Sequence, residues 1–157
     1  MAKAVVAPVA PVALEVPETP SQDSTQVAIT PPKYKKEELL QIFDTIMFEG
    51  EYREEIVIKN KLRITFVTRS AASSAEITRE LDEKKFNLLS SMQEYRALLC
   101  ICHSLVGYNG KDLTHQTPEA RKAFVEKLPT VVVAAISNAL VNFDIKTEAA
   151  LGELDSF

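Results

Sequence analysis

Residues 70–106 read SAASSAEITRELDEKKFNLLSSMQEYRALLCICHSLV, and this stretch contains neither proline nor glycine. Apolar side chains recur in it mostly at steps of three, four or seven residues, which is the period of one face of an α-helix. They are Ile77, Leu81, Leu88, Met92, Tyr95, Leu99, Cys102 and Val106. Ser70 or Ser73 can cap the start of the helix, and Gly107 can end it. We therefore expect one long helix here, with a bend near residues 87–91, because asparagine and serine are poor residues for a helix interior.

The segment before this helix, residues 51–69, predicts a β-hairpin. Apolar residues alternate with mostly polar ones in both halves of it, as they do in a half-buried strand. They are Ile56 and Ile58 in the first strand and Leu62, Ile64 and Phe66 in the second. Asn60, between two lysines, supplies the turn. Because an isolated hairpin is marginally stable, one of its faces has to lie on a helix, and we expect the long helix that follows to cover it.

Three further segments are predicted to be helical. Residues 35–48 have a broad apolar face and are followed by Gly50, which readily ends a helix. The run Thr117–Glu119 opens another helix, because it supplies a cap, a proline in the first turn and an acid at the positive end. Residues 130–151 form the third helix, and residues 107–113 are expected to form a turn with a short extended piece.

The first 32 residues differ in composition from the rest of the chain. They hold six of the eight prolines, no glycine and few charges. Alternating valine, alanine and proline favours an extended or polyproline II backbone. Two interpretations stay open, namely a disordered tail and an arm that lies along a neighbouring subunit; the valine and alanine content favours the arm. Residues 27–30 are β-prone and can add a strand to a partner's sheet.

These segments together predict an α+β fold that is mostly α. A single helical domain, residues 33–157, contains one β-hairpin packed on a long helix, and an extended Pro-rich arm, residues 1–32, precedes it. The helix over residues 130–151 is apolar all round in its first two turns, so it is buried either inside the domain or in an oligomer. The residues that we expect to contact partner chains belong to the arm and to this helix: Val5, Val9, Val12, Leu14, Val27, Ile29, Val131, Val132 and Ile136.

The sequence contains no catalytic or cofactor motif. Cys100, Cys102 and His103 resemble the start of a zinc site, but zinc needs four convergent ligands. Residues two apart on a helix point about 200° apart, so Cys102 turns away from the other two and the two thiols cannot form a disulfide. We therefore predict neither an enzyme nor a metal or cofactor site. Two thiols that cannot form a disulfide with each other fit a protein of a reducing compartment.

Composition narrows the class of partner. The formal net charge of −4 at pH 7 argues against nucleic acid as the main partner. The chain lacks tryptophan and has few aromatic residues, which argues against a base-stacking or carbohydrate-binding surface. Its apolar runs are shorter than the roughly 20 residues that a membrane helix needs, so we predict no membrane partner. We therefore expect the partners to be other proteins.

The order of four segments resembles that of known proteins. The segments are FEGEYREEIVI (residues 48–58), LRITFVTRSA (62–71), LLCICHSLVGYNGKDL (98–113) and KLPTVVVAAISNALVNF (127–143). In this order the chain resembles small structural or assembly proteins of tailed bacteriophages, among them tail-assembly chaperones and baseplate-hub-type subunits. The resemblance covers roughly residues 39–143 and implies no catalytic residues.

The resemblance implies a virion structural protein of the phage tail, baseplate or neck. Such a protein is assembled in the host cytoplasm, binds other phage structural proteins in a homo- or hetero-oligomer and is found in the virion. A tail-assembly chaperone that is absent from the mature particle is the alternative. The proline-rich arm departs from the chaperone pattern and favours a component that stays in the particle. A small metal-binding or enzymatic protein is a third alternative, and no motif supports it.

Overall fold

A computed structural model of the chain describes residues 34–152. The chain divides into two units, residues 1–32 and 33–157. The predicted arm lies outside the described residues, as do its six expected contact residues, Val5, Val9, Val12, Leu14, Val27 and Ile29.

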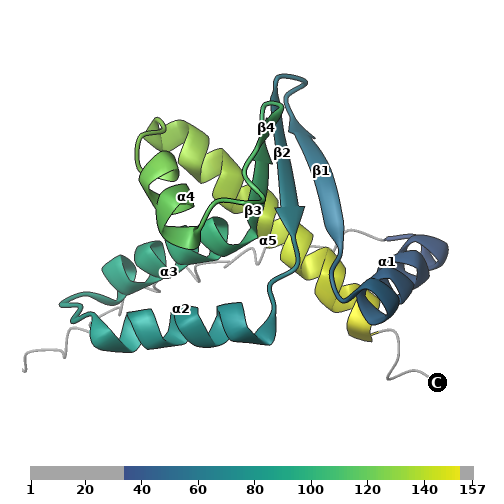
Figure 1. The fold of residues 1–157 in the computed structure, drawn as a ribbon, viewed down its shortest axis with the longest axis horizontal. Coiled ribbons are helices and arrows are strands. Elements are labelled where there is room, and N and C mark those ends of the chain that lie inside the picture. Colours follow the sequence, from purple (N-terminus) through teal and green to yellow (C-terminus); the bar gives the residue numbers. More distant parts are fainter. Residues whose placement is uncertain (1–33, 153–157) are drawn as a thin grey trace, which may run out of the picture. The chain divides into compact units, whose positions relative to one another are not determined.

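The described residues form five helices and one four-stranded antiparallel sheet, so the predicted α+β, mostly α fold is confirmed (Figure 1). In chain order the elements are α1 (Lys36–Glu49), β1 (Arg53–Ile58), β2 (Leu62–Val67), α2 (Ala71–Glu83), α3 (Leu89–Ser104), β3 (Leu105–Tyr108), β4 (Lys111–Asp112), α4 (Pro118–Val125) and α5 (Thr130–Gly152). In the described part of the chain, no helix is both long enough and apolar enough to cross a membrane.

The predicted hairpin is present, and its turn lies where the sequence places it. β1 pairs antiparallel with β2, and Ile58 lies opposite Leu62. Asn60 has φ of 56°, in the left-handed region that asparagine tolerates better than most residues. The Lys61 N–H closes the turn by donating to the carbonyl of Ile58 at 3.1 Å.

The long helix predicted to reach Val106 is two helices. Residues 84–88 separate α2 from α3, close to the expected bend, and α3 already ends at Ser104. Leu105 and Val106 are buried in strand β3, which pairs with β2 through Leu105 and Phe66. Helical periodicity does not reveal this change, because apolar residues at the end of a helix also suit a buried strand.

The segment after β3 is a second hairpin, where the sequence predicted a turn with a short extended piece. Asn109 and Gly110 form its two-residue turn, with φ of 47° and 81°. Asn-Gly is the preferred pair for such a turn because both positions need positive φ. The Asn109 N–H also donates to the carbonyl of Arg63 at 2.7 Å. The side-chain oxygen of Asn109 accepts from the N–H of Arg63. The expected helix stop is thus also the point that fixes β3 beside β2.

The main core lies between the sheet and α5. Ile64 and Phe66 of β2 pack with Ile136, Leu140 and Phe143 of α5. The ring centroid of Phe143 lies 5.7 Å from that of Phe66. The end of α3 also contributes Ile101, and the start of β3 contributes Leu105. The hairpin is therefore covered mainly by α5, and the predicted long helix covers it only with its last turn, because the chain turns back into the sheet there.

A smaller core joins α1 to the C-terminal part of α5. Leu39 and Ile42 are buried against Ala150, with Tyr52 and Ile46 beside them. α1 ends as predicted at Gly50, whose φ of 81° lets its N–H donate to the carbonyl of Ile46. α5 thus carries both cores on its inner side.

Candidate functional site

α5 has two apolar faces, and the described residues cover only one of them. On the inner face, Ile136, Leu140 and Phe143 are buried. On the opposite face, Val131, Val141 and Ile145 are 76%, 52% and 40% exposed. Because both faces are apolar, the sequence shows no polar stripe that would mark one of them as the solvent side.

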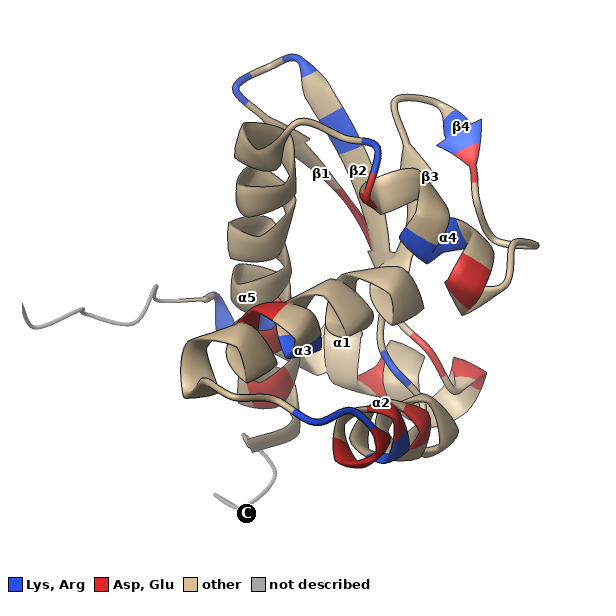
Figure 2. Ribbon diagram, turned by 90° about the vertical axis from the view of Figure 1, so that its left-hand side faces the viewer, with Lys and Arg blue, Asp and Glu red and all other residues tan. Residues whose placement is uncertain are grey.

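We call the exposed side the outer face of α5. It consists of Val131, Ala134, Ala135, Asn138, Val141, Asn142 and Ile145. The stretch of α5 from Thr130 to Phe143 contains no charged residue. Figure 2 shows these turns without the blue and red of charged residues, in contrast to α2. Proteins that act alone usually place charges on an exposed helix face, so this face has the composition of a contact surface.

A groove of about 620 Å³ separates part of this face from the hairpin. Its α5 side is lined by Val131, Ala134, Ala135, Asn138, Ala139 and Asn142, and its β1 side by Ile56, Val57, Ile58 and Lys59. Alanine side chains are short, so the groove lies where α5 has the least side-chain volume. The groove is therefore open, largely apolar and shaped to accept aliphatic side chains.

The β1 side of the groove is the edge of the sheet. Among the described strands, β1 pairs only with β2. Tyr52, just before β1, turns both of its backbone groups to Thr68 on the β2 side: its carbonyl accepts from the Thr68 N–H, and its N–H donates to the Thr68 side-chain hydroxyl. Because backbone groups alternate along a strand, those of Glu55 and Val57 point to the outer edge. A protein chain can thus meet both side chains and backbone groups at this place.

The structure separates the three described residues that the sequence singled out on this helix. Val131 lies on the outer face and in the groove. Val132 is half-buried against the main core, and Ile136 is fully buried in it. The surface thus contains Val131 and excludes Ile136, which instead holds α5 on the sheet.

Several residues of the surface were missed by the sequence reading. Ala134, Asn138, Val141 and Ile145 follow Val131 at alternating steps of three and four residues, and this spacing was available in the sequence. The spacing does not single out the outer face, because the inner face of α5 shows the same spacing through residues such as Ile136 and Phe143. The part of β1, including Val57, has no signal in the sequence, because only the packing brings it to α5.

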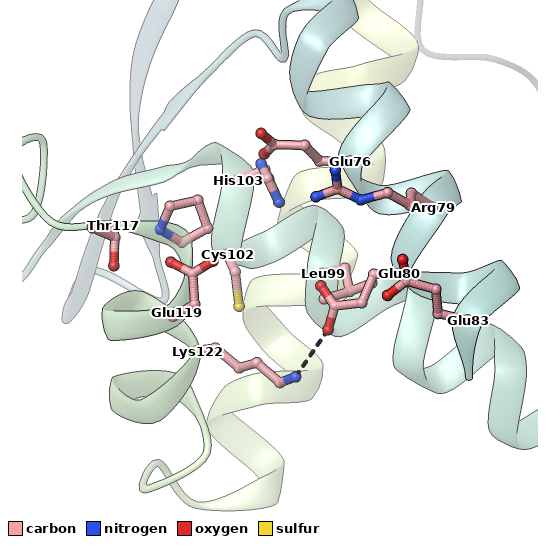
Figure 3. A pocket seen from close by; sticks show the side chains of 11 residues that line it. Glu76, Arg79, Glu80, Glu83, Leu99, Cys102, His103, Thr117, Glu119 and Lys122 are labelled. Carbon is pink, nitrogen blue, oxygen red and sulfur yellow. Dashed lines mark hydrogen bonds and ion pairs between the residues drawn. The ribbon is translucent and has the colours of Figure 1, made fainter. Parts of the chain in front are cut away.

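A second hollow, of about 480 Å³, lies between α2, α3 and α4, and most of the residues that line it are charged or polar (Figure 3). Lys122 reaches across it and donates to Glu80 at 3.2 Å and to the hydroxyl of Tyr95 at 2.6 Å. Tyr95 in turn donates to Glu80. The hydrogen bond from Tyr95 lowers the pKa of Glu80, and the hydrogen bond to Tyr95 raises the pKa of Lys122. Each of the three helices contributes one member, so this triad ties them together.

The thiol and imidazole beside this triad are poorly suited to nucleophilic chemistry. Cys102 is buried, and burial raises the pKa of its thiol to about 12, so the thiolate is not formed near neutral pH. Burial lowers the pKa of His103. The thiol thus remains protonated, and the hollow acts as a polar joint between helices.

Comparisons of the chain with protein-family models, with curated proteins and with solved structures found no match.

Proposed function

We propose that this protein is a non-enzymatic assembly subunit of a bacteriophage tail, baseplate or neck, which works by binding other protein chains and stays in the particle. The observation that supports the binding role is the outer face of α5, an uncharged and largely apolar helix face. It lies beside an open groove and beside an edge of β1 with which no other described strand pairs. The particle itself is suggested by the resemblance in the order of segments described above.

Leaving the outer face of α5 in water costs free energy. Val131, Val141 and Ile145 each expose a large part of an aliphatic side chain. Burying aliphatic surface stabilises a complex by roughly 25 cal/mol per Å² removed from water. The adjoining edge of β1 adds backbone donors and acceptors, which can bind a partner strand and fix its orientation as well as add affinity.

Retention in the particle is supported by the composition of the first 32 residues. Their six prolines and their low charge suit a stretched segment that follows the surface of another subunit. At about 3.1 Å per residue, such a segment can reach on the order of 100 Å. A chaperone that binds transiently does not need so long a contact with its partner.

Mass spectrometry of purified phage particles tests the proposal. We expect the chain to be recovered in a fixed ratio to the tail proteins. A Val141→Glu variant places a charge on the outer face and should be recovered at a much lower level. Leu89→Glu is the matched control, because Leu89 is an exposed aliphatic residue, at 66% against 52% for Val141, at the start of α3 and lies away from this face.

The possible results lead to different conclusions. If the chain is needed for tail formation but is absent from finished particles, it is a tail-assembly chaperone and the proposed retention is wrong. If Val141→Glu is incorporated as well as the wild type, the outer face of α5 is not the contact surface. If only Leu89→Glu lowers incorporation into particles, the contact surface lies near the connection between α2 and α3 and not on α5.

A further inference from the structure

We infer that the partner seated on the outer face of α5 is a second copy of this chain, with the two α5 helices antiparallel and the two-fold axis passing beside Asn138. This inference rests on the proposed function, since it names the partner of the same surface.

The first observation is that the outer face is arranged symmetrically about Asn138. Val131 and Ile145 each lie seven residues from it, on opposite sides. Ala135 and Val141 each lie three residues from it. In an antiparallel pair of helices centred on Asn138, each residue therefore meets its counterpart from the second copy. Val131 faces Ile145, and Ala135 lies at the same level as Val141.

The second observation is that these counterparts fit in size. The α5 side of the groove runs from Val131 to Asn142, and Ala134 and Ala135 leave the most space in it. The larger side chains of Val141 and Ile145 belong to the C-terminal half, do not line the groove and stand exposed. Rotation about the two-fold axis brings Val141 and Ile145 of each copy to the groove of the other. The contact is thus self-complementary, as a two-fold interface has to be.

The third observation is the distribution of charge along α5. Between Thr130 and Phe143 there is none, so the two α5 helices meet without like-charge repulsion. Lys127 is exposed just before the helix, and Glu148 is exposed near its end, about 15 Å from Asn138 at 1.5 Å per residue. An antiparallel pair brings Lys127 of one copy to the end of α5 that carries Glu148 of the other, and it also opposes the two helix dipoles.

A parallel pair lacks these advantages. It places groove against groove, because Ala134 and Ala135 of both copies lie at the same level. It also brings Lys127 next to Lys127. In both arrangements the two Asn138 side chains face each other and can exchange amide hydrogen bonds, so Asn138 by itself does not decide the direction.

The mass of the full-length chain in solution is the first test. By sedimentation equilibrium we expect a species of two chains, each of 17.4 kDa. Ala134→Glu puts a charge into the groove at an exposed position and should halve this mass while the circular dichroism spectrum stays unchanged. Ala75→Glu makes the same substitution at an exposed position of α2 and should leave the dimer intact. A wild-type protein that remains a single chain at about 100 µM, a concentration at which even weak dimers form, would overturn the inference.

Crosslinking tests the direction of the helices. A double variant, Val131→Cys with Ile145→Cys, is treated with a short bis-maleimide, and the wild-type chain, with its own two cysteines, serves as the control. We expect peptides that join position 131 of one copy to position 145 of the other. Peptides that join 131 to 131 and 145 to 145 would show a parallel pair and contradict the inferred arrangement.

The two proposals fail in different ways. If the wild type is a single chain but Val141→Glu still prevents incorporation into particles, the outer face binds another protein and only the dimer is wrong. If the dimer forms and Val141→Glu is incorporated normally, the dimer contact is real and the proposed role of this face in particle assembly is wrong.

Discussion

The ammonium group of Lys146 lies 2.9 Å from a carboxylate oxygen of Glu54. It also lies 2.6 Å from a carboxylate oxygen of Glu38, so one cation joins α5, β1 and α1. The Lys146 side chain is only 13% exposed. Burial by itself lowers the pKa of Lys146, but the hydrogen bonds to Glu38 and Glu54 outweigh it and hold the pKa above its ordinary value. This contact fixes the base of the β1 edge, and with it one side of the groove, against α5.

Replacing Lys146 should loosen this junction. Lys146→Met keeps most of the side-chain volume but leaves two carboxylates close together without their cation. We expect the free energy of unfolding to fall by about 1–3 kcal/mol, less than for a fully buried pair because both acids are partly exposed. Urea unfolding measures it. Lys61→Met, in the exposed hairpin turn, is the control and should change stability by less than about 0.5 kcal/mol.

The same contact predicts a dependence on alkaline pH. Because folding raises the pKa of Lys146 above 10.5, its contribution is fully present below that pH. The contribution is lost as the pH rises through the higher pKa of the folded state. The stability difference between the wild type and Lys146→Met should therefore be constant from neutral pH to about 10 and shrink above it. A difference that already disappears between pH 7 and 9 would show that the lysine is not held by these acids.

Tyr95→Phe tests the triad that joins α2, α3 and α4. The change removes the hydroxyl that donates to Glu80 and accepts from Lys122. We expect a loss of about 0.5–1 kcal/mol, because solvent screens the partly exposed carboxylate. The bond from Tyr95 is the main cause of the lowered pKa of Glu80, so in the wild type this stabilisation is present above pH 4.5 and lost as the pH falls through the folded pKa. The variant should lose less stability on acidification. An equal acid dependence of both proteins in urea titrations would contradict the role of Tyr95.

Gly107→Ala tests the close approach of β3 to β2. A Cβ atom at Gly107 would lie 2.7 Å from the hydroxyl oxygen and 2.9 Å from the Cβ of Thr65. We expect thermal unfolding to show a loss of about 1–3 kcal/mol from overpacking. Adding Thr65→Ala should restore part of it, because the side-chain hydroxyl no longer obstructs the new methyl group. Gly152→Ala meets nothing within 4 Å and should be neutral. Equal effects of the two glycine changes would disprove the crowding.

Local patterns of the sequence predicted most of the secondary structure. The αL cap at Gly50, the Thr117 cap before Pro118 and the positive φ of Asn60 all depend on residues within a few positions of each other. Such features form by the same rules in any tertiary context. The alternation in β1 and β2 is of the same kind. The arm and its six valine, leucine and isoleucine residues remain a prediction.

The sequence alone determined most of the helical segments, where the first hairpin turns and that α5 is apolar on both sides. Only the tertiary structure decided that Leu105 and Val106 leave the helix to pair with β2, and that α5 covers the sheet with Ile136 and Phe143 while Val131 and Val141 stay outside. Caps and turns are local, so neighbouring residues specify them. The choice between two equally apolar faces depends on which one meets a partner of matching shape, and that partner, β2, lies some 70 residues away in the chain.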